Sequence, residues 1–247
     1  RLHGRRAALA LTMLLACDPF LIGHSGLLHT DALLTTFIFL ALGAALNGLS
    51  EPHRLAWWPL AGLFTGLALL TKLSAAILLT FIPVLILVAQ RAHPKALLVS
   101  TILFSACVIL TAFLLYPVFW ADLPAAIERL FASAEKHVET VQHPVFFAGR
   151  MTYDPGPAFY PVVFVFRVSP VVLAGLLIGL AGARRMPAGQ RRAFALLIAF
   201  ALAFGAMIGL GAKKYDRYLL PVFPPLTLAA VLGWMNLDRR LLPLLPI

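Results

Sequence analysis

The stretch His24-Ser-Gly-Leu-Leu-His-Thr-Asp31 is a short polar island between two long apolar segments. It places one carboxylate and two imidazoles next to a run that is long enough to enter the hydrocarbon core of a membrane as a helix. Thr30 or Asp31 could simply cap that helix, because a side-chain oxygen at this position accepts a free backbone N–H group. The rest of the chain indicates whether the island has a further role.

The composition places the chain in a membrane. The 247 residues are 61% hydrophobic and 12% charged, whereas a soluble domain is roughly half apolar and about a quarter charged. We therefore predict an all-α polytopic membrane protein, a single transmembrane domain covering residues 1–247 with about eight spanning helices. The expected spans are 7–23, 31–48, 55–71, 73–90, 95–117, 160–183, 193–211 and 218–236.

The basic residues set the expected orientation. The net charge of +10 forms no single patch, which argues against nucleic acid as a partner. If the N-terminus is cytoplasmic, the inner segments hold 12 basic residues and the short outer turns hold four, as the positive-inside rule requires. The four outer cations oppose that rule, so we expect them to bind an anion such as a lipid phosphate. They are Lys72, Lys213, Lys214 and Arg217.

These cations could also serve only to hold the helices at the lipid headgroups. Lys72 could extend to lipid headgroups along its apolar stem, and the turn 213–218 could be a headgroup anchor. Arg167 lies within an expected span, where it needs a carboxylate such as Asp154 or a bound phosphate.

The one long connection, residues 118–159, is expected outside the membrane. Apolar residues recur at offsets of three and four between 125 and 138, which predicts an amphipathic helix. This helix would lie on the outer leaflet or pack against the bundle. Tyr153 and Tyr160 are aromatic residues that could stack on a sugar, although packing at the interface explains them equally well.

The outer turns therefore gather acids, imidazoles and cations. No Walker or Rossmann fingerprint is present, so we expect no nucleotide cofactor. Such a set suits a reaction in which a phosphate leaves as an anion, because cations stabilise the developing charge. A nearby carboxylate can accept a proton or hold a metal ion.

The chain also resembles a known family, the polyprenyl-phosphate-dependent membrane glycosyltransferases with the GT-C fold, which include protein mannosyltransferases and aminoarabinose transferases. The resemblance spans nearly the whole chain and depends on the order and spacing of several short motifs. These are Cys17-Asp-Pro19, His24-Ser25, His29-Thr-Asp31, Gly66-Leu-Ala-Leu-Leu-Thr-Lys72, His143, Phe146-Phe-Ala-Gly149, Phe159-Tyr-Pro161, Lys214 and Arg217-Tyr-Leu-Leu-Pro221.

The resemblance implies transfer of a sugar from a polyprenyl-phosphate carrier to a protein, lipid or glycan acceptor at the extracytoplasmic face of the cell membrane. It implies that an acid in a first outer loop acts as general base. Asp31 matches the second acid, which helps to form the catalytic site and is a candidate ligand of a divalent metal. Donor-binding residues would be Lys72, Arg167, Lys213, Lys214, Arg217 and Tyr218. The sugar or acceptor site would include His24, His29, His143, Tyr153 and Tyr160.

Two other functions fit the residues. A secondary transporter would place ionisable residues or broken helices near the middle of the membrane, and a non-catalytic subunit could bind the lipid carrier with the same cations. In the family, an outer loop with a principal acid precedes a segment like this one. We therefore expect the chain to be an incomplete piece, truncated at both ends and inactive alone.

Overall fold

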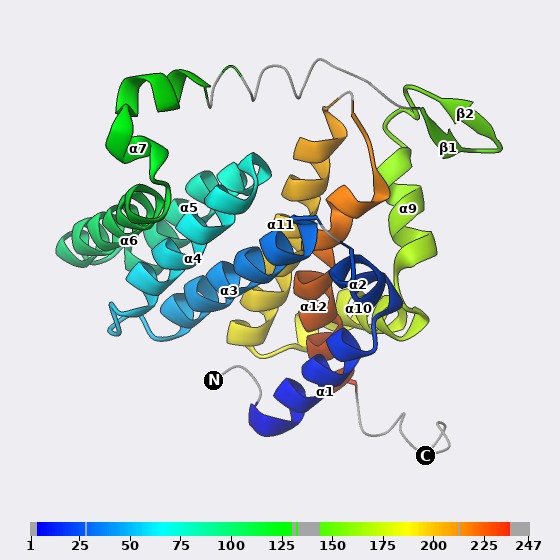
Figure 1. Ribbon diagram of the computed structural model, residues 1–247. Helices are drawn as coiled ribbons and strands as arrows, with labels where there is room; N and C mark the ends of the chain where they lie inside the picture. Colours follow the sequence, from blue (N-terminus) through cyan, green and yellow to red (C-terminus); the bar gives the residue numbers. More distant parts are fainter. Residues whose placement is uncertain (1–3, 28, 130–131, 133–143, 212, 238–247) are drawn as a thin grey trace.

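The structure is a computed structural model of the chain, and it describes residues 4–27, 29–129, 132, 144–211 and 213–237. The described part is predominantly helical (Figure 1). Its helices, with η marking a 3-10 helix, are α1 (Gly4–Ala16), α2 (Pro19–Ser25), α3 (Asp31–Ser50), α4 (Trp57–Thr71), η1 (Leu73–Ile77), α5 (Leu78–Gln90), α6 (Pro94–Leu115), α7 (Val118–Ala121), α9 (Phe159–Arg167), α10 (Pro170–Gly182), η2 (Ala183–Arg185), α11 (Ala188–Gly209), η3 (Asp216–Val222) and α12 (Phe223–Met235). Strands β1 (Val145–Phe147) and β2 (Arg150–Thr152) form an antiparallel hairpin.

Five helical segments of the described residues are long and apolar enough to cross a membrane, and the number rises to seven if each of two bent helix pairs is one span. The protein is therefore an all-α, multi-pass membrane protein, as predicted. Each of the eight expected segments is helical, but α4 has only 15 residues. The expected number of eight spans thus remains a prediction.

Two expected spans, 7–23 and 160–183, are not continuous helices. Helices α1 and α2 meet at an angle of 60°, and α9 meets the segment 170–185 at 112°. Both breaks precede a proline, Pro19 or Pro170, because the proline ring disfavours helical backbone in the residue before it. At the first break, the Asp18 carboxylate accepts the Leu21 N–H at 2.9 Å and starts the new helix.

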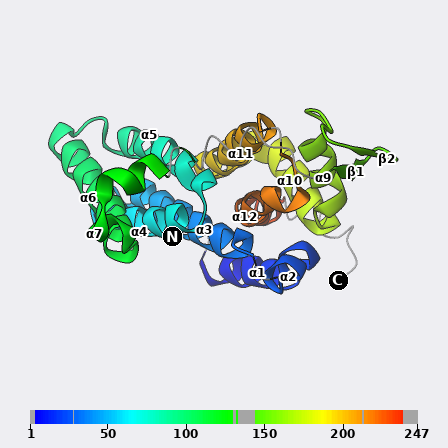
Figure 2. The same cartoon turned by 45° about the horizontal axis from the view of Figure 1, so that its top comes forward.

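The helices form two groups, one of α4, α5 and α6 and one of α10, α11 and α12 (Figures 1 and 2). Small residues allow close packing within each group. A Cβ atom on Gly66 of α4 would lie 2.7 Å from Cβ of Thr111 in α6, and one on Gly233 of α12 would overlap the Gly175 carbonyl of α10. Glycine is therefore required at both crossings.

Helix α3 joins the two groups, because it packs on α4 and α5 on one side and on η3 on the other. Leu34 and Ile38 of α3 and Leu220 of η3 are fully or almost fully buried. Phe20 of α2 packs on Phe223 at the start of α12, with ring centroids 4.8 Å apart. The first turn of α3 is thereby fixed between the α4–η1 junction and η3.

The long connection is described in part. Residues 123–129 are helical, and the Asp122 carboxylate accepts the Ala125 N–H at 3.0 Å. Most of the expected amphipathic helix 125–138, together with His143, lies outside the described residues. The hairpin β1–β2 and α9 follow (Figure 1).

Candidate functional site

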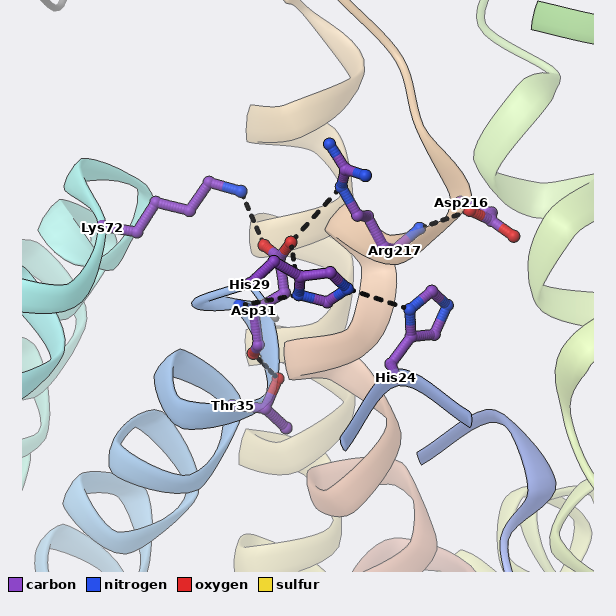
Figure 3. A network of polar contacts seen from close by, with 7 residues as sticks. All are labelled: His24, His29, Asp31, Thr35, Lys72, Asp216 and Arg217. Atoms are coloured by element: carbon purple, nitrogen blue, oxygen red, sulfur yellow. Dashed lines mark hydrogen bonds and ion pairs between the residues drawn. The ribbon is translucent and has the colours of Figure 1, made fainter. Parts of the chain in front are cut away.

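Asp31 is the first residue of α3, and its side chain is only 4% exposed. The contacts of the Asp31 carboxylate go beyond those of a helix cap. Thr30, the residue at the cap position, makes no side-chain hydrogen bond to the helix. Figure 3 shows instead that both oxygens of Asp31 face cationic side chains from other elements.

Those cations are Lys72 and Arg217. Lys72 lies between α4 and η1, where extended backbone ends the helix, and its Nζ donates to Oδ1 of Asp31 at 2.6 Å. Arg217 lies in η3, and its Nε is 3.4 Å from Oδ2. One cation comes from each helix group, so the carboxylate lies at the junction between the two groups.

Aromatic rings support the same cations. The Nζ of Lys72 lies 4.0 Å from the ring centroid of Tyr218, and the Arg217 guanidinium lies 4.8 Å from that of Tyr215. Lys213 also lies over Tyr215, at 5.6 Å. Such contacts attract a cation to the negative face of the ring. Tyr215 was not among the named donor-binding residues, although it lies in the turn 213–218 that was expected to meet the carrier phosphate.

The two imidazoles extend the network away from the cations. His29 Nδ1 lies 3.4 Å from Oδ2 of Asp31 and accepts the Asp31 N–H at 3.3 Å. His29 Nε2 lies 3.4 Å from His24 Nδ1 (Figure 3). If His29 is neutral, its proton is on Nε2 and points to His24. We call His24, His29, Asp31, Lys72 and Arg217 the Asp31 network.

Two more ion pairs lie next to this network, and one is joined to it because Asp216 Oδ1 accepts the backbone N–H of Arg217 at 2.8 Å (Figure 3). Arg167 Nη2 donates to Oδ2 of Asp216 at 2.8 Å, and Lys214 Nζ donates to Oδ1 of Asp154 at 3.2 Å. The expectation that Asp154 is the carboxylate partner of Arg167 is therefore wrong. The α9–α10 bend turns the end of α9 toward η3, and Asp154 instead faces Lys214.

The charges of these groups influence one another. The Gly156 N–H and the Lys214 ammonium lower the pKa of Asp154, which lies outside the spanning helices. Burial lowers the pKa of Lys72, while the hydrogen bond and the charge of Asp31 oppose that effect. The five cations at 72, 167, 213, 214 and 217 and the three carboxylates at 31, 154 and 216 leave a net charge of +2, which suits an anionic ligand.

A cavity of about 340 Å³ lies between the hairpin, α9 and the start of η3, and no residue of the Asp31 network lines it. Its walls are mostly apolar, with Arg167 and Asp216 among the lining residues. Tyr160 is buried beside Phe159, with ring centroids 5.1 Å apart. Tyr153 is exposed. These two tyrosines therefore do not join the Asp31 network.

The described residues do not fit a metal ion at Asp31. No group of three or more His, Cys, Asp or Glu side chains within the described ranges could hold one. Both oxygens of Asp31 also face cations, which would repel a divalent ion.

Comparisons with known proteins agree with the sequence motifs. Residues 1–120, which include His24, His29, Asp31 and Lys72, match the family model described as dolichyl-phosphate-mannose-protein mannosyltransferase. No curated protein and no solved structure matches the chain. Over residues 1–120 the chain is therefore similar to the dolichyl-phosphate-mannose-protein mannosyltransferases, which confirms its resemblance to the GT-C membrane glycosyltransferases.

Proposed function

We propose that the protein transfers a sugar from a polyprenyl-phosphate carrier to an acceptor at the extracytoplasmic face of the membrane. The observation that carries this proposal is the convergence of Lys72 and Arg217 on one carboxylate at the ends of apolar helices. The tail of a polyprenyl carrier stays in the bilayer, so its phosphate must lie at the end of the helices. Lysine and arginine together suit phosphate oxygens, one as a point charge and one as a planar fork.

The chemistry needs few groups. An acceptor oxygen bonds to the anomeric carbon, and the bond between that carbon and the phosphate oxygen breaks, with its electron pair passing to the phosphate. Lys72 and Arg217 stabilise the charge that develops there. Asp31 accepts the acceptor proton as general base, and His29 lies within reach of the same carboxylate. No step in this scheme requires a metal ion.

The proposed face follows from the distribution of charge. The start of α11 lies near Ser50, at the end of α3 remote from Asp31, because Gly189 and Arg192 line a cavity with Ser50. Four arginines flank this start: Arg184, Arg185, Arg191 and Arg192. Clusters of arginine flanking spans are retained in the cytoplasm. The Asp31 network would then open toward the extracytoplasmic side, with the hairpin above it.

A transfer assay tests the proposal. Membranes that contain the protein would receive a polyprenyl phosphate carrying a radiolabelled sugar, with detection of label on endogenous acceptors. We expect Lys72→Ala to reduce transfer about 100-fold, the effect of losing one group that stabilises a developing anion. Lys95→Ala removes an exposed lysine from the first turn of α6 and should leave transfer unchanged. Equal transfer by both variants would contradict the proposal.

One observation favours a secondary transporter as a second candidate. Two spans are broken, and ionisable residues lie at the breaks, Asp18 at the first and Arg167 at the second, as in many transporters. Both side chains nevertheless have partners within the protein, since Asp18 caps α2 and Arg167 pairs with Asp216. Uptake of carrier or sugar by liposomes that contain the protein, without any transfer, would favour this candidate over the enzyme.

A further inference from the structure

The carboxylate of Asp31 has the contacts that a bound phosphate would need. It presents two oxygens of one anion, one to the Lys72 ammonium and one to the Arg217 guanidinium. The side chain is buried, and its partners come from both helix groups. A second anion that uses the same two cations must approach this carboxylate closely.

We infer that Asp31 is a placeholder for the phosphate of the lipid carrier: it occupies Lys72 and Arg217 when the carrier is absent and competes with the phosphate for them. This inference depends on the proposed donor site and adds an order of events to it. The phosphate then pairs with the two cations, and the Asp31 carboxylate moves away from them because two anions side by side repel each other. Carrier binding thereby separates Asp31 from its ion pairs.

The exchange links binding to chemistry. Once the donor is bound, the oxygens of Asp31 no longer pair with Lys72 and Arg217, so they are free to take the acceptor proton. After transfer, the acceptor proton is on Asp31 and the carrier is left as a phosphate monoester. A neutral Asp31 no longer competes for the cations. When the proton leaves, with His29 as the adjacent acceptor, the carboxylate recovers Lys72 and Arg217 and displaces the product.

The groups that face Asp31 come from each neighbouring element. Lys72 comes from the α4–η1 junction, Arg217 from η3 and His29 from the turn before α3. His24 of α2 contacts His29, and the Tyr218 ring lies under Lys72. Lys72 and Arg217 are the cations that contact the carboxylate oxygens among the described residues, so the competition should depend on them.

The test is the binding of a polyprenyl phosphate without sugar to the purified protein in nanodiscs, measured by isothermal titration calorimetry. Asp31→Asn keeps the shape of the side chain and removes its charge. We expect it to lower Kd for polyprenyl phosphate by about tenfold, because it removes a like charge from the site. Asp18→Asn is the matched control. Asp18 is as deeply buried as Asp31, and asparagine caps a helix about as well as aspartate, so Kd should not change.

A second pair of variants tests whether the gain in affinity caused by Asp31→Asn depends on the cations. In a Lys72→Met background, Asp31→Asn should tighten binding clearly less than it does in the wild type. A gain in affinity cannot result from misfolding, which would weaken binding. Binding that Asp31→Asn leaves unchanged or weakens would overturn the placeholder while the donor site stands. A complete lack of binding by the wild type and both aspartate variants would instead remove the donor site, and the placeholder with it.

Discussion

The two ends of α3 carry acids in contrasting surroundings. At its start, the Asp31 side chain is 4% exposed and faces Lys72 and Arg217 from distant parts of the chain. Directly after its end, the Glu51 side chain is 33% exposed. Its partners are near neighbours in the chain, Arg54 at 3.1 Å and the indole N–H of Trp57, the first residue of α4, at 3.3 Å.

The surroundings of the two acids indicate that Glu51 has a local structural role and that Asp31 belongs to a candidate functional site. An exposed ion pair between near neighbours adds little to stability and simply shapes a loop. A buried carboxylate costs free energy to desolvate, and even well-formed pairs often fail to repay that cost. An acid held in this way by cations from two helix groups therefore calls for a function, and the proposed donor site provides one.

The two ends of α3 should differ most in whether a reagent outside the cell can reach the residues near them. With both native cysteines replaced by serine, an impermeant thiol reagent applied to intact cells should label Ala148→Cys, at the tip of the hairpin. It should not label Ala188→Cys, at the start of α11, whose neighbour Gly189 lines a cavity with Ser50 at the far end of α3. Labelling at 188 without labelling at 148 would reverse the proposed orientation.

Neutralising the two acids should affect transfer very differently. Asp31→Asn should reduce the rate of sugar transfer by about 100-fold or more, the contribution of a positioned general base. Glu51→Gln should leave the rate unchanged, because its contacts are local and exposed. The two variants should be compared at equal protein amounts in the same membranes. Normal turnover by Asp31→Asn would reduce Asp31 to a structural residue.

A smaller effect should appear in the reactivity of Lys72. Burial lowers the pKa of Lys72, and Asp31 opposes this effect, so Asp31→Asn should lower that pKa further. The neutral amine then becomes more abundant at a given pH. Acylation of Lys72 by an amine-reactive reagent, followed by peptide mass spectrometry, should be several-fold faster in Asp31→Asn and unchanged in Glu51→Gln. Slower acylation in Asp31→Asn would show that the carboxylate does not hold the proton on Lys72.

Much of the fold was predictable from the length of the charge-free apolar runs. The expected segments 31–48 and 95–117 correspond closely to α3 (Asp31–Ser50) and α6 (Pro94–Leu115). Helix α11 begins at Ala188, five residues before the expected start at 193, because arginines are tolerated in the first turn outside the apolar core. The bends at Pro19 and Pro170 were missed, although a polar residue followed by proline signals a helix start in both cases.

The site was predictable in its residues but not in its pairings. The sequence singled out Lys72 and Arg217 because, in the expected orientation, they lie in short outer turns where the positive-inside rule predicts few cations. Which carboxylate each cation meets depends on how the helices pack, and that information is not local. Arg167 illustrates this limit, since its partner is Asp216 and not Asp154.

The most direct test of the central claim, that Lys72 and Arg217 hold one phosphate, is a double-mutant cycle on donor binding. Kd for a polyprenyl-phosphate sugar would be measured for the wild type, Lys72→Ala, Arg217→Ala and the double variant, with Arg54→Ala as a control at the far end of α3. We predict that each single change at the site weakens binding and that the two are coupled by roughly 0.5–3 kcal/mol, as for groups that share a partner. Unchanged donor affinity in both single variants, with strict additivity in the double variant, would contradict the claim and leave these cations as headgroup anchors.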